Sequence, residues 1–150
     1  RVPQGLGKRN CPGTGRDAMA PRQAHAGRVL VMDDEEYILE LAVGMLRHFG
    51  YDARGVGNGT EAVREYRAAM EKGNGFNAVI MDLTIPGGMG GREALAEIRA
   101  FDPEVVAIVS SGYSNDPVMA NFRAYGFRGV LAKPYTIDDI LKAIDEAVSG

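Results

Sequence analysis

Four short runs of continuous apolar residues limit what this chain can fold into. They are residues 29–32, 78–81, 105–109 and 129–132, rich in β-branched side chains and without polar alternation. Runs of this length and composition suit strands that are buried on both faces. A weaker strand is expected near residues 51–56. Strands of this kind need helices above and below their sheet.

Amphipathic segments lie between the apolar runs. Two long stripes recur at helical spacing: Tyr37, Ile38, Leu41, Met45, Leu46 and Phe49, then Ile137, Ile140, Leu141, Ile144 and Val148. Shorter amphipathic stretches cover about 60–72, 91–100 and 116–125. Asn58 precedes Glu61 by three residues and Thr136 precedes Asp139 by three, a spacing typical of helix starts. Strand and helix therefore alternate about five times, which predicts an α/β, doubly wound parallel sheet with helices on both faces.

The first 27 residues differ in composition from the rest of the chain. They hold five basic residues and one acidic residue, a net charge of +4, which leaves −7 for residues 28–150. Three prolines, five glycines and few large apolar side chains predict a flexible basic linker or tail at 1–27 and one domain at 28–150. A nucleic-acid-binding arm is the alternative for the tail, although the acidic body argues against nucleic acid as its own ligand.

Neither disulfides nor membrane insertion is expected. The chain has one Cys, and no apolar run approaches the ~20 residues needed to span a bilayer. The start lacks the apolar core of a signal peptide, so a cytoplasmic setting is expected. The chain begins with Arg1, which favours a fragment of a larger protein. It ends at Gly150, just after the last expected helix, so no attached DNA-binding domain is expected.

Chemically competent side chains follow four of the apolar runs, and parallel strands end at one edge of a sheet. In chain order they are Asp33 and Asp34, Asp82, Ser110 and Ser111, and Lys133. Each one alone is explained as a helix cap, a turn residue or a surface cation. Three carboxylates at one edge, however, would concentrate like charge unless a cation is present. Carboxylates without a Cys/His cluster favour Mg²⁺ and a phosphate-bearing partner, and an Asp can itself accept a phosphoryl group.

Four segments in this order resemble the receiver domain of two-component response regulators: residues 32–35, 81–87, 110–113 and 132–135. The resemblance covers about 28–148. Residues 82–91, 110–120 and 125–135 are most similar to receivers at the C-terminus of hybrid sensor histidine kinases. The resemblance to receiver domains implies a flavodoxin-like five-stranded sheet with strand order 2-1-3-4-5 and a role in phosphorelay signal transduction.

The resemblance also implies roles for single residues. Asp82 would be the phosphoacceptor, taking its phosphoryl group from a phosphohistidine of a sensor histidine kinase or histidine phosphotransfer domain. Asp34 would bind Mg²⁺ directly and Asp33 mainly through water, with Asp82 and the backbone carbonyl of Thr84 as further ligands. Lys133 would pair with the phosphoryl group or, before phosphorylation, with Asp82.

Further expectations concern the switch. Ser111 occupies the Ser/Thr position whose hydroxyl the phosphoryl group would pull inward, with Ser110 as the alternative. The bond between Lys133 and Pro134 is expected to be cis. Val130 departs from the family, which often has an aromatic residue there. Tyr113 could shield the phosphoryl group from water.

The expected activity is that of a signalling module. The domain would promote its own phosphorylation and dephosphorylation without being a turnover enzyme, and would signal through its fourth helix, last strand and last helix. It is not expected to contact nucleic acid or membrane directly, and a homodimer is a possible assembly. A stand-alone regulator and a Mg²⁺-dependent aspartyl-phosphate phosphatase are the alternatives. The second is disfavoured because residues 33–35 lack the Asp-x-Asp pattern of such enzymes.

Overall fold

A single parallel sheet organises the computed structural model, which describes residues 27–112 and 115–149. Its strand order is β2-β1-β3-β4-β5, which confirms the predicted doubly wound fold. The strands are β1 (Arg28–Met32), β2 (Asp52–Val56), β3 (Ala78–Asp82), β4 (Ala107–Ser111) and β5 (Gly129–Ala132). The predicted tail, apart from Gly27, and the predicted shield Tyr113 lie outside the described residues.

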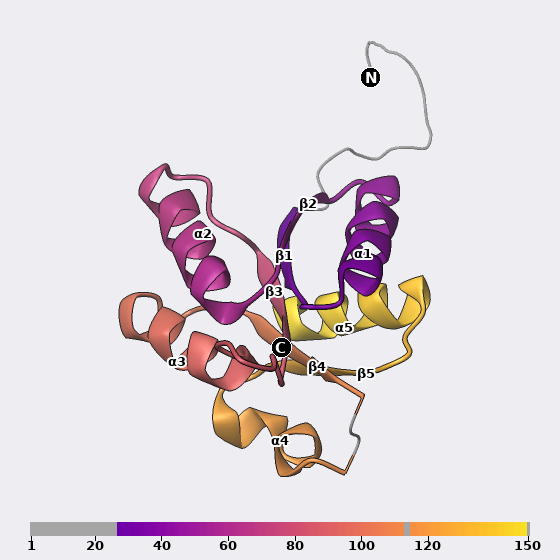
Figure 1. The fold of residues 1–150 in the computed structure, drawn as a ribbon. Helices are drawn as coiled ribbons and strands as arrows, with labels where there is room; N and C mark the ends of the chain where they lie inside the picture. The colour runs from indigo at the N-terminus through magenta and orange to yellow at the C-terminus, as the bar shows by residue number, and fades with distance from the viewer. Residues whose placement is uncertain (1–26, 113–114, 150) are drawn as a thin grey trace, which may run out of the picture.

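Helices cover both faces of this sheet (Figure 1). They are α1 (Glu36–His48), α2 (Gly59–Glu71), α3 (Gly91–Phe101), α4 (Pro117–Ala120), the 3-10 helix η1 (Phe122–Tyr125) and α5 (Ile137–Ser149). Helices α1 and α5 pack on one face, and α2, α3, α4 and η1 pack on the other. Within the described residues no helix is long and apolar enough to cross a membrane.

Both predicted helix starts are capped by side chains. The Asn58 side chain accepts a hydrogen bond of 3.0 Å from the backbone N–H of Glu61. Thr136 and Asp139 cap each other reciprocally: the Asp139 N–H donates to Thr136 Oγ1 at 3.2 Å, and the Thr136 N–H donates to Asp139 at 2.9 Å. These local bonds satisfy N–H groups that a helix start leaves unpaired, and so set where α2 and α5 begin.

Alternation along each strand creates two separate cores. In β1, Leu30 and Met32 join the core beneath α2 and α3, whereas Val29 and Val31 join the core beneath α1 and α5. Both sets are buried because successive side chains of a strand point to opposite faces. The same alternation decides which strand-end residues point toward which helices.

The stripe expected on the first helix coincides only in part with the face that α1 buries, which includes its Leu46 and, partly buried, its Met45. The buried residues of α1 are Ala42, Val43 and Leu46, whereas Tyr37 is 78% exposed, Leu41 48% and Phe49, just after the helix, 50%. Apolar side chains occupy more of the helix circumference than the sheet can cover. Helical spacing therefore predicted the helix but only part of its contact face.

The single helix expected over 116–125 is instead two short pieces, α4 and η1. The Asp116 side chain caps α4 by accepting a 2.9 Å hydrogen bond from the Val118 N–H. Asn121 then leaves the helical region, with φ −134° and ψ 50°. Asn favours such conformations because its side chain competes with helical hydrogen bonds. Gly126, with φ +96°, ends η1 in the left-handed region.

Candidate functional site

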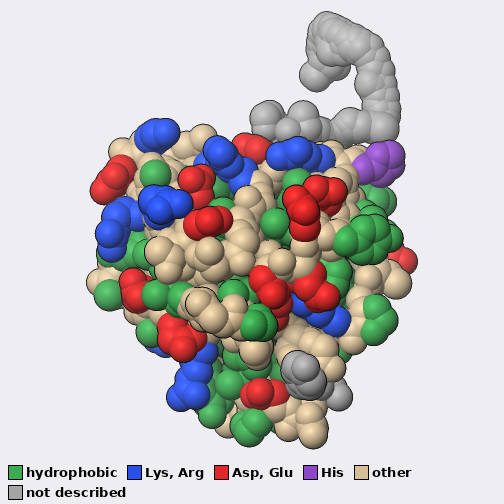
Figure 2. Space-filling view, viewed as in Figure 1, with side chains coloured by type: hydrophobic (Ala, Val, Ile, Leu, Met, Phe, Trp, Pro, Cys, Tyr) green, Lys and Arg blue, Asp and Glu red, His purple; other side chains and the backbone are tan. Residues whose placement is uncertain are grey.

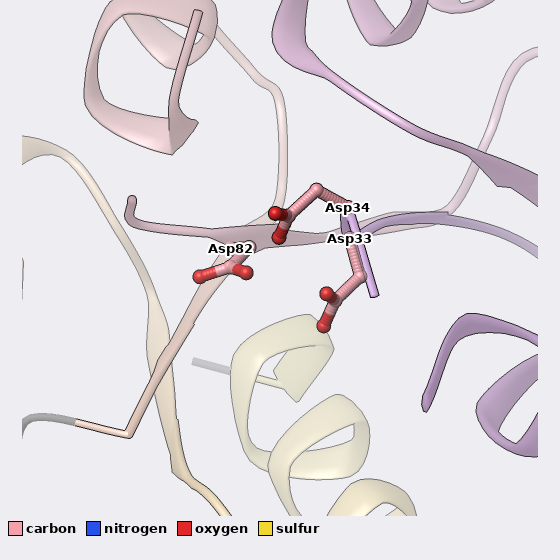
Figure 3. Close-up of side chains that lie close together, drawn as sticks. All are labelled: Asp33, Asp34 and Asp82. Atoms are coloured by element: carbon pink, nitrogen blue, oxygen red, sulfur yellow. The ribbon is translucent and has the colours of Figure 1, made fainter. Parts of the chain in front are cut away.

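Three carboxylates meet at the carboxyl edge of the sheet (Figure 3). Asp33 and Asp34 directly follow β1, and Asp82 is the last residue of β3, the neighbouring strand. Each offers one oxygen, and these three oxygens lie within 4.8 Å of one another. The topology therefore brings together residues that are about 50 positions apart in sequence.

Asp33 is the most deeply buried of the three, with 1% of its surface exposed. One carboxylate oxygen, Oδ1, accepts a 2.9 Å hydrogen bond from the backbone N–H of Glu35. The other, Oδ2, is buried and accepts no well-aligned hydrogen bond, although the Lys133 ammonium lies 2.8 Å away. Such an under-satisfied buried oxygen is costly unless it has a further partner, and a cation is the partner that suits it.

Lys133 is shared among the acidic groups. Its Nζ atom lies 2.8 Å from Asp33 Oδ2 and 3.1 Å from Asp82 Oδ2. A third carboxylate, Glu35, lies 3.7 Å away and was not among the predicted site residues. The only sequence signal for Glu35 was its place directly after Asp33 and Asp34.

The loop that follows β5 places Lys133 at this edge. The Lys133 backbone N–H donates a 2.9 Å hydrogen bond to the carbonyl of Ser111 at the end of β4. The peptide bond between Lys133 and Pro134 is cis.

Burial shapes the titration of the site. It raises the pKa of the Asp82 carboxyl from 3.8 to about 6, with the Lys133 ammonium opposing the rise and the Asp33 carboxylate adding to it. Burial alone would lower the pKa of Lys133, but its hydrogen bond to Asp82 and the nearby charges of Asp33 and Asp82 raise it above 10.5. Burial and the Asp33 charge likewise raise the pKa of Tyr135 to about 12. The ammonium is therefore held charged beside an acid that ionises reluctantly.

The two predicted serines lie on opposite faces of β4. Both are buried, with 1% of Ser110 and 2% of Ser111 exposed. Ser110 shares a face with Ile108, in the core beneath α1 and α5, and Ser111 shares a face with Val109, in the core beneath α2 and α3. Val130 packs against that second core.

Thr84 lies on the loop after β3, next to Asp82. Its backbone N–H donates a 3.3 Å hydrogen bond to Asp82 Oδ1. This bond anchors the loop beside the carboxylate.

The three carboxylates fit a small divalent cation. Hard cations bind oxygen ligands, and the cluster supplies three of them, one of which belongs to an under-satisfied Asp33 carboxylate. Asp34 is exposed, so the cluster opens to solvent on one side. That opening gives room for water or phosphate oxygens to complete the coordination shell.

A family model of the response regulator receiver domain matches residues 29–145. The chain belongs to this family. The chain is 35% identical over 139 residues to the transcriptional regulatory protein PdtaR of Mycobacterium tuberculosis (strain ATCC 25618 / H37Rv), an alignment that covers 92% of this chain and 62% of PdtaR. It is 28% identical over 120 residues to the chemotaxis protein CheY of Thermotoga maritima, covering 79% of this chain and 95% of CheY.

Solved structures show the same fold. The receiver domain of the sensor histidine kinase PA1611 from Pseudomonas aeruginosa PAO1, which has a magnesium ion coordinated in its active-site cleft, superimposes with a TM-score of 0.71. It is 24% identical, and the match covers 83% of this chain and 98% of that one. By contrast, the match spans 17% of the transcription factor SKN7 of Saccharomyces cerevisiae and 75% of this chain, at 29% identity. The chain thus covers less than two thirds of several relatives.

Proposed function

We propose that this receiver domain accepts a phosphoryl group on Asp82 from a phosphohistidine and so acts in phosphorelay signal transduction. One observation carries the proposal: Asp82 ends β3 beside two further carboxylates, with the Lys133 ammonium 3.1 Å from its Oδ2 atom. An Asp carboxylate in such a setting can act as a nucleophile toward phosphorus, because nearby cations offset the charge of the transferred group.

The proposed transfer breaks the nitrogen–phosphorus bond of the donor and forms a bond between phosphorus and an Asp82 carboxylate oxygen. The donor imidazole leaves with the electron pair of the broken bond. Lys133 would move from pairing with Asp82 to pairing with a phosphoryl oxygen. The Ser111 hydroxyl, at the end of the adjacent strand, is the proposed donor to another phosphoryl oxygen, with Ser110 as its rival.

Mg²⁺ is the proposed cofactor. Asp34, Asp82 and the backbone carbonyl of Thr84 would bind the ion directly, and Asp33 mainly through water. Bound Mg²⁺ would neutralise negative charge that develops on the phosphoryl oxygens. The under-satisfied Oδ2 atom of buried Asp33 supports this assignment.

We propose that the phosphodonor packs along the exposed ridge of α1. Tyr37, Leu41 and Phe49 form this ridge, and it starts three residues after Asp34. Figure 2 shows hydrophobic side chains on this side of the molecule, next to acidic side chains gathered near the middle of the view. A partner seated there would reach the carboxylates with its histidine.

The test of the docking ridge is Leu41→Ser. Transfer from a phosphorylated histidine phosphotransfer protein should slow, whereas phosphorylation by acetyl phosphate should not change. Equal slowing with both donors would place the defect in the site or the fold, and unchanged rates would remove the ridge from the proposal.

The parent protein is proposed to be a hybrid sensor histidine kinase in the cytoplasm. The segments 82–91, 110–120 and 125–135 support this origin through their similarity to receivers of such kinases. A stand-alone regulator is the alternative, supported by the CheY of Thermotoga maritima, which the chain covers almost completely.

The test of the phosphoacceptor is an intact-mass measurement after incubation with Mg²⁺ and acetyl phosphate. We expect one hydroxylamine-labile phosphoryl adduct that is lost in Asp82→Asn and when the metal is chelated. Asp52→Asn, at the opposite end of the sheet, is the matched control and should keep the adduct. An adduct that persists in Asp82→Asn would overturn the assignment.

A further inference from the structure

Three arginines gather around η1, on the face of the sheet opposite α1. The Arg92 guanidinium carbon lies 4.7 Å from the centre of the Tyr125 ring, and that of Arg123 lies 5.2 Å from the Phe122 ring. The Arg99 guanidinium packs against Gly126. Arg92, Arg99 and Arg123, with the two rings, form what we call the arginine face. Figure 2 shows Lys and Arg side chains at the lower left, where Figure 1 places α3 beside α4.

Helix α3 presents two of these arginines on one side. Arg92 and Arg99 are seven residues apart, so they share a side of the helix about 10 Å apart along its axis. The acidic residues of α3 lie elsewhere: the Glu93 carboxylate turns toward Gly90, and Glu97 is about 140° around the helix from Arg92. The α3 part of the arginine face is therefore positive without interspersed acids.

Gly126 makes room for this arrangement. It adopts φ +96°, a conformation that side chains rarely accept, and a Cβ there would collide with the Arg99 guanidinium. Partly buried Phe122 and Tyr125 support the other two guanidinium groups from below. A guanidinium stacked on a ring keeps its N–H edges available for hydrogen bonds.

No carboxylate among the described residues pairs with these three arginines. Arg28 and Arg54 of the same domain do find acidic partners, 2.8 Å from Asp52 and 3.8 Å from Glu65, whereas most other cations of the described residues have none. The arginine face differs in that three such cations lie together, although residues 28–150 contain 19 acidic and 12 basic residues. Unpaired guanidinium groups in such an acidic domain leave a positive surface to be matched from outside.

We propose that the arginine face binds a short acidic segment of a partner protein. Two carboxylates of the segment would pair with Arg92 and Arg99, and an apolar side chain between them would pack on the Tyr125 ring. In the polyproline II conformation a segment rises about 3.1 Å per residue with three residues per turn, so acidic residues three positions apart lie on one side and match the spacing of the two arginines. This surface is separate from Asp82 and from the α1 ridge, so the proposal does not depend on phosphorylation.

The charge of the whole domain favours an acidic peptide over nucleic acid. Residues 28–150 carry a net charge of −7, which repels a long polyanion. A short segment with two or three carboxylates meets mainly the local positive surface.

The experiment is a titration of the ¹⁵N-labelled full chain with a fluorescein-labelled hexapeptide, followed by NMR and fluorescence polarisation. The peptide carries two glutamates three residues apart that flank an alanine and a leucine, and a matched peptide carries glutamines instead. We expect saturable shifts at Arg92, Arg99, Tyr125 and Gly126. The double variant Arg92→Gln/Arg99→Gln should weaken binding about tenfold or more, and the double variant Arg64→Gln/Lys72→Gln at α2, with the same change in charge, should leave it nearly unchanged.

Four outcomes of the peptide titration would overturn the proposal. They are no saturable shift at millimolar peptide, equal binding of the glutamine peptide, equal binding by the double variant, and shifts that map away from α3 and η1. Sedimentation velocity on the same samples tests a second copy of this chain as the occupant. Salt-sensitive dimers that the double variant abolishes would assign the face to self-association and likewise overturn the proposal. Circular dichroism of each variant checks that it remains folded.

Discussion

The two ends of the sheet differ in how their charged and polar groups are paired. At the amino end, the Arg28 guanidinium pairs with Asp52 at 2.8 Å and lies 4.4 Å from the Phe76 ring, while the Tyr66 hydroxyl donates to Asp102 at 2.5 Å. Each of these groups has a matched partner. At the carboxyl end, one ammonium serves three carboxylates, and Asp33 keeps an under-satisfied oxygen.

This difference separates stability from function within one fold. Matched polar groups at the amino end hold α2, α3 and the strand starts together. Like charges at the carboxyl end oppose folding, and they are arranged for an incoming cation and phosphoryl group. Removal of a polar or charged group should therefore lower stability at the amino end, and removal of a carboxylate should raise it at the carboxyl end. Lys133 is the exception at the carboxyl end, because its removal should lower stability.

The largest change in stability is expected for Lys133→Met. Removal of the ammonium leaves Asp33 and Asp82 buried without their cation, which should lower the free energy of unfolding by about 3 kcal/mol in EDTA. Mg²⁺ should restore more stability to this variant than to the wild type, because it replaces the missing positive charge. Urea unfolding with and without Mg²⁺ measures both effects, and an unchanged midpoint in EDTA would contradict the role given to Lys133.

The next largest change is a gain, for Asp82→Asn. The folded pKa of Asp82, about 6, lies above its ordinary value of 3.8, so the unfolded chain releases this proton more readily. The Asp82 contribution therefore reduces stability progressively as pH rises from about 4 to about 6, and the full cost is present above that range.

Asp82→Asn should remove this cost and raise the free energy of unfolding by about 2 kcal/mol at pH 7 in EDTA. The gain should vanish below pH 4, where the wild-type carboxyl is protonated in both states. Chemical unfolding at a series of pH values tests this, and a gain that persists at low pH would point to another cause.

At the amino end, Tyr66→Phe should destabilise the domain. Tyr66 is 3% exposed, and its hydroxyl links α2 to the end of α3 through Asp102. Loss of a hydrogen bond to a charged acceptor is expected to cost about 1–2 kcal/mol, and Mg²⁺ should not restore it. Tyr37→Phe is the matched control, since Tyr37 is 78% exposed and its loss of a hydroxyl should have no effect.

The smallest effect is expected for Asp52→Asn. Asp52 pairs with Arg28 at 2.8 Å, but its side chain is 61% exposed, so water and salt screen the interaction. Thermal unfolding should show a loss below about 1 kcal/mol that shrinks further at high salt. A larger loss would mean that the amino end depends on this pair rather than on Tyr66.

Much of the site could be predicted from the sequence, because all strands of a parallel sheet end at the same edge. Asp33, Asp82 and Lys133 each follow an apolar run, so strand order alone brings them together. Glu35 was missed, because its 3.7 Å approach to Lys133 depends on how α1 starts. The break at Asn121 was missed as well, since the residues on both sides of it keep helical spacing.

The sequence by itself determined the number and kind of strands, the helices between them and the acidic chemistry at the strand ends, because these depend on local patterns and chain order. Only the tertiary structure decided which surfaces stay open. Helix α1 has more apolar residues than one sheet face can cover, and contact with the sheet selected Ala42, Val43 and Leu46 while Tyr37 and Leu41 remained outside. Likewise, the arginines of α3 and η1 form one surface only because the fold places Tyr125 against Arg92 and Gly126 against Arg99. Such choices arise from packing between distant segments, which no local pattern encodes.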